Sequence, residues 1–176
     1  EGLDSSFTAV IFIGYHSGML NPGNALAHTL NPKLHKILIN NVLASEFLIN
    51  SYYASTLGVP IAFLSGDESL TKAIKEINPN IEICSTLTGK SGASIARHPS
   101  ITNLEIEDKV FKSLQKDLSN NLVELPKEFK IEIEYRSHQE AYSASFFPGC
   151  KLIDYNRIRY ETKNFYDALV LFKFVA

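Results

Sequence analysis

The sequence predicts an α/β fold, with a mixed α/β sheet flanked by helices and an α+β carboxyl-terminal continuation. Two short apolar runs, residues 9–13 and 59–64, are rich in the branched and aromatic residues typical of buried strands. Strand and helix patterns alternate up to about residue 85, as in an α/β unit. Because no repeat, low-complexity tract or linker interrupts the chain, residues 1–176 are predicted to form a single domain.

The first half contains the predicted α/β unit. Its strands are expected at residues 7–13, 59–64 and 81–85. Its helices are expected at residues 42–57 and 70–77. Asn40-Asn41 is expected to open the longer helix, and Gly58 to end it. Two short extended pieces, residues 28–30 and 34–39, lie on either side of Asn31-Pro32 and favour a hairpin.

The second half mixes short strands and helices on the same predicted core. Residues 86–99 are rich in Gly, Ser and Thr and are predicted to form a loop. Residues 129–135 alternate between apolar and charged side chains, which is typical of a strand with one exposed face. Helices are expected at residues 104–118, 138–146 and 164–175. Short strands are expected at residues 151–153 and 157–160.

The composition is that of a globular protein, with 45% apolar residues, 20% charged residues and a net charge of −2. A net charge so close to zero does not indicate binding to nucleic acid or to an anionic membrane surface. No apolar stretch in the sequence has the length of a membrane span. Two cysteines are too few for a disulfide framework, so a cytoplasmic location is expected. The chain begins with Glu1 and its single methionine is Met19, so it is expected to be a processed or truncated piece of a longer protein.

Two histidines and a glutamate are the candidate functional residues. His16 follows the first predicted strand, at the end of the sheet where α/β proteins place ligands, and His28 and Glu46 come within the next thirty residues. Imidazole and carboxylate groups can serve as zinc ligands or as a pair of proton-transfer groups. Both histidines could equally be structural, hydrogen-bonded residues. Glu46 lies near an apolar helix face, where its carboxylate needs a metal, an arginine or a backbone N–H as partner.

Three other features carry weaker signals. Asp67 follows the second predicted strand and could be a metal ligand or accept a hydrogen bond from a metal ligand. We favour a third interpretation, in which Asp67 caps the helix at residues 70–77. Thr88-Gly89-Lys90-Ser91 is not a phosphate-binding loop, because Cys84 stands where that motif requires its first glycine. No sequence argument makes Cys150 a nucleophile.

The segment from Phe7 to Glu68 resembles the D-aminopeptidase family of zinc metallopeptidases, the DppA-like peptidases. The resemblance is carried by an ordered set of short motifs: Gly14-Tyr15-His16, Asn21-Pro22-Gly23, His28, Ile39-Asn40-Asn41 leading to Glu46, Gly58-Val59-Pro60-Ile61 and Ser65-Gly66-Asp67. It continues more weakly through Arg97-His98-Pro99 and Phe147-Pro148-Gly149 to the closing helix. The chain would correspond to the carboxyl-terminal part of such an enzyme.

The resemblance implies a metallo-aminopeptidase with a dinuclear zinc (Zn) centre. His16 and Glu46 match two metal ligands, and His28 matches the histidine with a catalytic role. The family releases N-terminal, often D-, amino acids from short peptides, in peptide transport or degradation, and its members form ring-like homo-oligomers.

The chain also departs from the family pattern, because the Asp-x-Glu-Gly and Asn-Asp-x-His motifs that supply the other ligands do not occur in it. We therefore expect only part of the metal site here and a companion amino-terminal segment elsewhere. The alternatives are a non-catalytic peptide-binding or scaffold relative, and an unrelated α/β domain with structural histidines.

Overall fold

A computed structural model describes residues 2–21 and 23–176, so Pro22 of the predicted Asn-Pro-Gly turn lies outside the described residues. The chain divides into two compact units. The first unit comprises Glu1–Ser17, Asn21–Ala27 and Asn50–Leu125. The second comprises Gly18–Leu20, His28–Ile49 and Pro126–Ala176. The assignment of residues 1–176 to a single domain stays a prediction.

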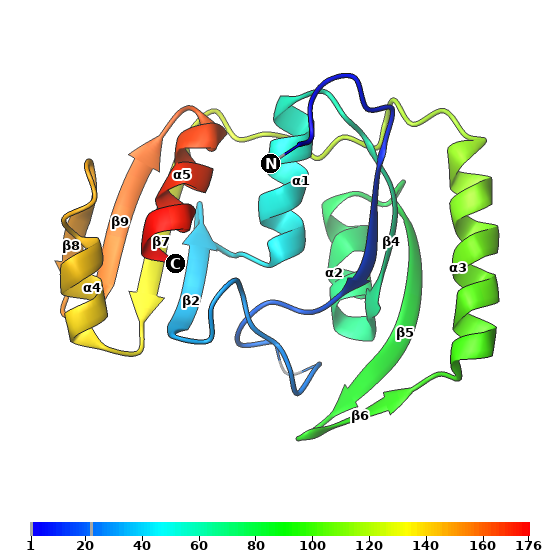
Figure 1. Cartoon of the computed structure of the whole chain (residues 1–176), viewed down its shortest axis with the longest axis horizontal. Helices are drawn as coiled ribbons and strands as arrows, with labels where there is room; N and C mark the ends of the chain where they lie inside the picture. Colours follow the sequence, from blue (N-terminus) through cyan, green and yellow to red (C-terminus); the bar gives the residue numbers. More distant parts are fainter. Residues whose placement is uncertain (1, 22) are drawn as a thin grey trace. The chain divides into compact units, whose positions relative to one another are not determined.

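The first unit is built on a four-stranded sheet with the order β1-β4-β5-β6. The strands are β1 (Val10–Tyr15), β4 (Ile61–Asp67), β5 (Glu82–Lys90) and β6 (Ala93–Ala96). Strands β1, β4 and β5 are parallel, and β6 pairs antiparallel with β5. Helices α2 (Glu68–Ile77) and α3 (Pro99–Leu114) pack on β4 and β5 from opposite sides (Figure 1). Every residue of β4 is buried, as expected for a parallel strand that is covered on both faces.

Strand β1 differs from its prediction as a buried strand. It begins at Val10 instead of residue 7, and Ile11 and Ile13 are 38% and 57% exposed. The reason is its position, because β1 lies at the edge of the sheet, next to β4, and among the described residues no second strand pairs with it. An apolar run alone does not distinguish an edge strand from a central one.

The prediction of a loop over residues 86–99 is wrong. Strands β5 and β6 form a hairpin there, with Thr88 opposite Ile95 and the turn at Ser91, whose φ is +55°. Helix α3 then begins at Pro99, five residues before its predicted start, and His98 caps it by accepting a hydrogen bond from the backbone N–H of Ser100. Proline suits the first helical position because the N–H it lacks would have no partner within the helix.

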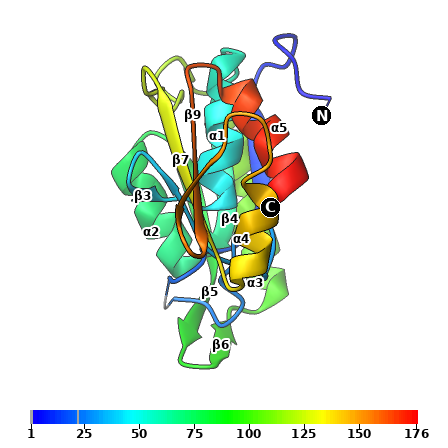
Figure 2. The same cartoon turned by 90° about the vertical axis from the view of Figure 1, so that its left-hand side faces the viewer.

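The second unit is built on a five-stranded antiparallel sheet with the order β3-β2-β7-β9-β8. The strands are β2 (Leu34–Ile39), β3 (Val42–Leu43), β7 (Phe129–Tyr135), β8 (Lys151–Asp154) and β9 (Arg157–Thr162). Helices α4 (His138–Ala144) and α5 (Phe165–Val175) pack on β7 and β9 (Figures 1 and 2). The prediction of a strand at residues 129–135 is confirmed, and Phe129, Ile131 and Ile133 are buried. Its predicted exposed face is wrong, because Glu132 is 7% exposed and forms ion pairs with Lys130 and Arg159.

Asn40-Asn41 forms a hairpin turn and does not open a helix. Both residues have positive φ, +51° and +67°, which suits a tight turn between β2 and β3 because asparagine tolerates the left-handed conformation. The predicted partner strand at residues 28–30 is absent, and Val42–Leu43 pairs with β2 in its place. Helix α1 (Glu46–Thr56) therefore begins four residues later than predicted, at Glu46.

The predicted fold class is confirmed, because the chain combines one mainly parallel and one antiparallel sheet with flanking helices. None of the helices in the described part of the chain has both the length and the apolar character that crossing a membrane requires.

The Asn40-Asn41 turn gives the first testable prediction. Replacing Asn41 with valine lowers the free energy of unfolding by about 1–2 kcal/mol, because a β-branched residue is strained at positive φ. Asn41→Gly is the matched control and is expected to retain wild-type stability within about 0.5 kcal/mol. Urea denaturation of the three proteins measures the difference, and a valine variant as stable as the glycine variant would contradict the turn.

Candidate metal centre

Glu46 is held at the start of α1 by two local contacts. Ser45 caps the helix, since its Oγ accepts a hydrogen bond from the backbone N–H of Leu48 at 3.2 Å. One carboxylate oxygen of Glu46 accepts a hydrogen bond from the backbone N–H of Leu30 at 3.0 Å. A carboxylate in the first turn is also favoured by the positive end of the helix dipole. The backbone N–H partner considered from the sequence is therefore present, and it orients a half-buried carboxylate.

A buried threonine joins the segment of His28 to the segment of Glu46. Thr29 is 1% exposed, and its hydroxyl donates to the carbonyl of Ala44 at 2.8 Å and accepts from the N–H of Met19 at 3.1 Å. Gly18 lies against the same junction, where a Cβ atom would come within 3.0 Å of the Ala44 carbonyl oxygen. These contacts draw three stretches of the second unit together.

The consequence is that two candidate site residues, His28 and Glu46, lie close together within the second unit. A ring nitrogen of His28 and a carboxylate oxygen of Glu46 lie within 4.8 Å of each other, and both residues are half-buried. Zinc binds imidazole nitrogen and carboxylate oxygen with bonds of about 2 Å, so two side chains this close fit one metal centre. Both groups are thus of the kind that zinc sites use, and their spacing allows both to lie beside one zinc ion.

His16 belongs to the first unit, directly after β1. Its Nδ1 lies 3.1 Å from the carbonyl oxygen of Ser17. Because a carbonyl oxygen only accepts, this hydrogen bond places the proton of the neutral ring on Nδ1 and leaves Nε2 as the nitrogen able to bind a metal. The role of His16 as a metal ligand stays a prediction.

Asp67 is fully buried in the first unit and fixes the residue after His16. Its carboxylate accepts hydrogen bonds from the N–H and hydroxyl of Ser17, from the side-chain amide of Asn24 and from the N–H of Leu70. The bond from Leu70 confirms the predicted helix cap of α2. Burial raises the pKa of Asp67, but these hydrogen bonds outweigh burial and leave the pKa below its usual value.

Comparison with known proteins places this chain in a family. The family model described as D-aminopeptidase matches residues 1–174. The chain belongs to the D-aminopeptidase family. A curated relative, the D-aminopeptidase of Bacillus subtilis strain 168, is 25% identical over 153 residues, which make up 86% of this chain and 56% of the relative. The chain thus spans about half the length of that curated relative.

A solved structure gives the same assignment for the fold. It is the Zn-dependent D-aminopeptidase DppA from Bacillus subtilis, described as a self-compartmentalizing protease. The TM-score is 0.87 at 25% sequence identity, and the match covers 99% of this chain and 66% of that one. The resemblance to the D-aminopeptidase family predicted from the sequence is therefore confirmed.

The cysteines of this D-aminopeptidase-family chain are unsuited to nucleophilic chemistry. Cys84 is buried and Cys150 is half-buried, and neither forms a disulfide. Burial raises the pKa of both thiols, that of Cys150 to about 11, so the reactive thiolate is scarce at neutral pH. This agrees with the sequence, which gave no argument for a cysteine nucleophile.

Sequence reasoning did not identify the residues that support the site. Thr29 stands next to His28, and Ser17 stands next to His16, so adjacency to a candidate residue was the one available signal. The partners of Thr29 lie ten and fifteen residues away along the chain, and nothing in the sequence marks them.

The Asp67 cluster gives the second prediction. Asp67→Ala lowers the free energy of unfolding by at least about 2 kcal/mol, because the helix cap is lost and buried donors lose their acceptor. The exposed Asp108→Ala is the matched control and is expected to change stability by less than about 0.5 kcal/mol. Thermal and urea unfolding at neutral pH compare the variants, and equal losses in both would contradict the role of Asp67.

The same carboxylate has a pH signature. Because its folded-state pKa lies below the unfolded value, Asp67 contributes stability above the unfolded pKa and loses it as pH falls through the folded pKa. The stability difference between wild type and Asp67→Asn should therefore shrink as pH falls from about 6 to about 3. A difference that stays constant over this range would show that the charge of Asp67 is not what stabilises the fold.

Proposed function

We propose that this chain carries part of the metal site of a zinc-dependent aminopeptidase that releases N-terminal residues, D-amino acids among them, from short peptides. The observation that carries the proposal is the pairing of His28 with Glu46 within 4.8 Å inside one compact unit. Membership of the D-aminopeptidase family and the likeness to a Zn-dependent D-aminopeptidase support the same activity.

In this proposal His16 and Glu46 are zinc ligands and His28 is the catalytic residue beside them. The hydrogen bond from His16 Nδ1 to Ser17 favours metal binding through Nε2, and the Leu30 N–H holds the Glu46 carboxylate in place. The centre is proposed to be dinuclear, with further ligands from a companion amino-terminal segment, because the Asp-x-Glu-Gly and Asn-Asp-x-His motifs do not occur in this chain.

Zinc, when bound, supplies a water of lowered pKa and polarises the scissile carbonyl. The side chains of this chain have complementary tasks. His28 is positioned by Thr29 and moves a proton between water and the leaving amine. Glu46 keeps one oxygen on the Leu30 N–H, which leaves its other oxygen to face the centre.

Two further properties are proposed with this activity. We propose a homo-oligomer, because the DppA structure is described as a self-compartmentalizing protease. A cytoplasmic location rests on the small number of cysteines alone.

The third prediction separates the ligand from the catalytic residue, with the companion segment present. Glu46→Gln should lower both bound zinc and peptide hydrolysis, because an amide is a much poorer zinc ligand than a carboxylate. His28→Ala should lower kcat by about 10²–10⁴-fold while bound zinc is retained, because it removes a proton-transfer group. Elemental analysis and release of D- and L-alanine from alanyl peptides measure the two effects.

Matched controls are available for both residues. The exposed His138→Ala and Glu124→Gln variants should keep wild-type zinc content and activity. Full hydrolysis by both test variants, or hydrolysis that a chelator does not abolish, would overturn the proposal. Peptide binding without hydrolysis in the zinc-loaded wild type would instead identify a non-catalytic relative.

The fourth prediction concerns pH. Zinc affinity should fall as pH is lowered from about 8 to about 5, because an imidazole must be neutral to bind the metal. Competition with a chromogenic chelator at several pH values measures the affinity. A flat affinity across this range would exclude imidazole coordination.

A further inference from the structure

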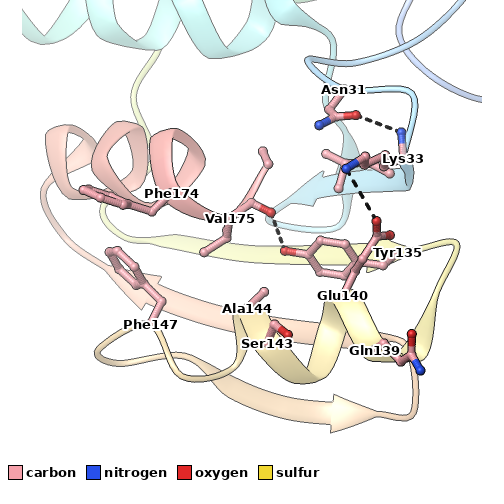
Figure 3. Close-up of a pocket in the computed structure, with 12 residues that line it drawn as sticks. Asn31, Lys33, Tyr135, Gln139, Glu140, Ser143, Ala144, Phe147, Phe174 and Val175 are labelled. Atoms are coloured by element: carbon pink, nitrogen blue, oxygen red, sulfur yellow. Dashed lines mark hydrogen bonds and ion pairs between the residues drawn. The ribbon is translucent and has the colours of Figure 1, made fainter.

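The second unit contains a pocket of about 530 Å³ that shares no residue with the His28–Glu46 pair. It lies among α4, α5, β7 and the start of β2, and Figure 3 shows its lining side chains. Pockets of this size commonly hold small molecules, with a mostly apolar wall and a few polar groups that fix orientation. The lining of this pocket likewise combines apolar side chains with a few polar and charged ones.

The buried part of the lining is mainly apolar. Leu34, Tyr135 and Ala144 are 2%, 3% and 9% exposed. The hydroxyl of Tyr135 donates to the carbonyl of Val175 at 2.7 Å (Figure 3). Burial raises the pKa of Tyr135, so this hydroxyl stays neutral. The Tyr135 hydroxyl is therefore uncharged and already has a hydrogen-bond partner.

One side of the pocket carries two opposite charges. Lys33 Nζ and Glu140 Oε1 lie 4.0 Å apart, and their side chains are 70% and 36% exposed. The backbone N–H of Lys33 donates to the Asn31 side chain at 2.9 Å, which fixes the start of this segment (Figure 3). An exposed ion pair at this distance contributes little to stability, so the pair is available to a ligand at little cost to the fold.

Another side of the pocket is aromatic. The rings of Phe147 and Phe174 have centroids 6.0 Å apart and an interplanar angle of 36°. Phe174 is 74% exposed at this position, so most of its ring is open to contact. An apolar group placed against these two rings would be removed from water together with them.

We propose that this pocket binds a free α-amino acid with an apolar side chain. Its carboxylate pairs with Lys33 and its ammonium with Glu140, and its side chain extends over Tyr135 and Ala144 toward Phe147 and Phe174. The two charged groups of an amino acid are attached to one carbon, about 3 Å apart, which suits charges as close as Lys33 and Glu140. In a dipeptide the terminal charges are separated by a further peptide unit of about 3.8 Å, which suits the pair less well.

The proposal is tested by calorimetry with D-leucine and L-leucine on the full chain. Saturable binding is expected for leucine, with at least a tenfold higher Kd for N-acetyl-leucine, which lacks the ammonium, and for leucinamide, which lacks the carboxylate. Glu140→Gln should abolish the discrimination against N-acetyl-leucine, and Lys33→Met should abolish the discrimination against leucinamide. Each charged partner is thereby matched to one charge of the ligand.

Matched variants control for general effects. Glu124→Gln, Lys127→Met and Phe146→Ala, at residues outside the pocket lining, should bind leucine as wild type does, whereas Phe174→Ala should weaken binding. Binding that persists in His28→Ala would distinguish this pocket from the proposed active site. No saturable binding, or equal binding of leucine and its two derivatives by wild type, would overturn the proposal.

Discussion

The close approach of His28 and Glu46 depends on the hydrogen bonds of the Thr29 hydroxyl. This hydroxyl accepts a hydrogen bond from the N–H of Met19 and donates one to the carbonyl of Ala44. The two segments that contain Met19 and Ala44 are thereby held against the segment of His28, although no helix or strand joins them. A buried hydroxyl that lost either partner would be costly, which makes this arrangement strongly preferred over looser ones. Glu46 then follows from Ala44 by two residues and reaches back to the Leu30 N–H. The proximity of His28 and Glu46 thus results from packing between loop segments more than from any helix or strand.

In the first unit a carboxylate, that of Asp67, orders the loop that follows His16. Asp67 stands at the end of a fully buried strand and gathers donors from Ser17, Asn24 and Leu70. The same side chain therefore starts a helix and fixes the loop that follows His16. Functional loops at the carboxyl ends of strands need such anchors, because a loop has no hydrogen-bonding ladder of its own. In each unit one buried polar residue orders the loop that carries a candidate site residue.

Local signals were predictable from the sequence, and long-range pairing was not. The strand at Phe129–Tyr135 and the cap at Asp67 depend on residues close in sequence, and both are confirmed. The burial of Glu132 in that strand could not be predicted, because it depends on an ion pair with Arg159 of the neighbouring strand. Asn40-Asn41 was misassigned because asparagine favours both helix starts and left-handed turns, and only pairing with β2 decides between them. The β5–β6 hairpin was missed because its glycine and serine content resembles a loop. The candidate ligands could be named from the family resemblance, but Thr29 could not, since its partners are distant in sequence.

The proposed role of Glu46 as a zinc ligand is tested most directly by anomalous X-ray scattering. Crystals of the zinc-loaded protein, with data on both sides of the zinc absorption edge, should show an anomalous peak about 2 Å from a carboxylate oxygen of Glu46. The Glu46→Gln protein should lose the peak under the same conditions. Zinc found only at other positions, with no peak beside Glu46, would contradict the account.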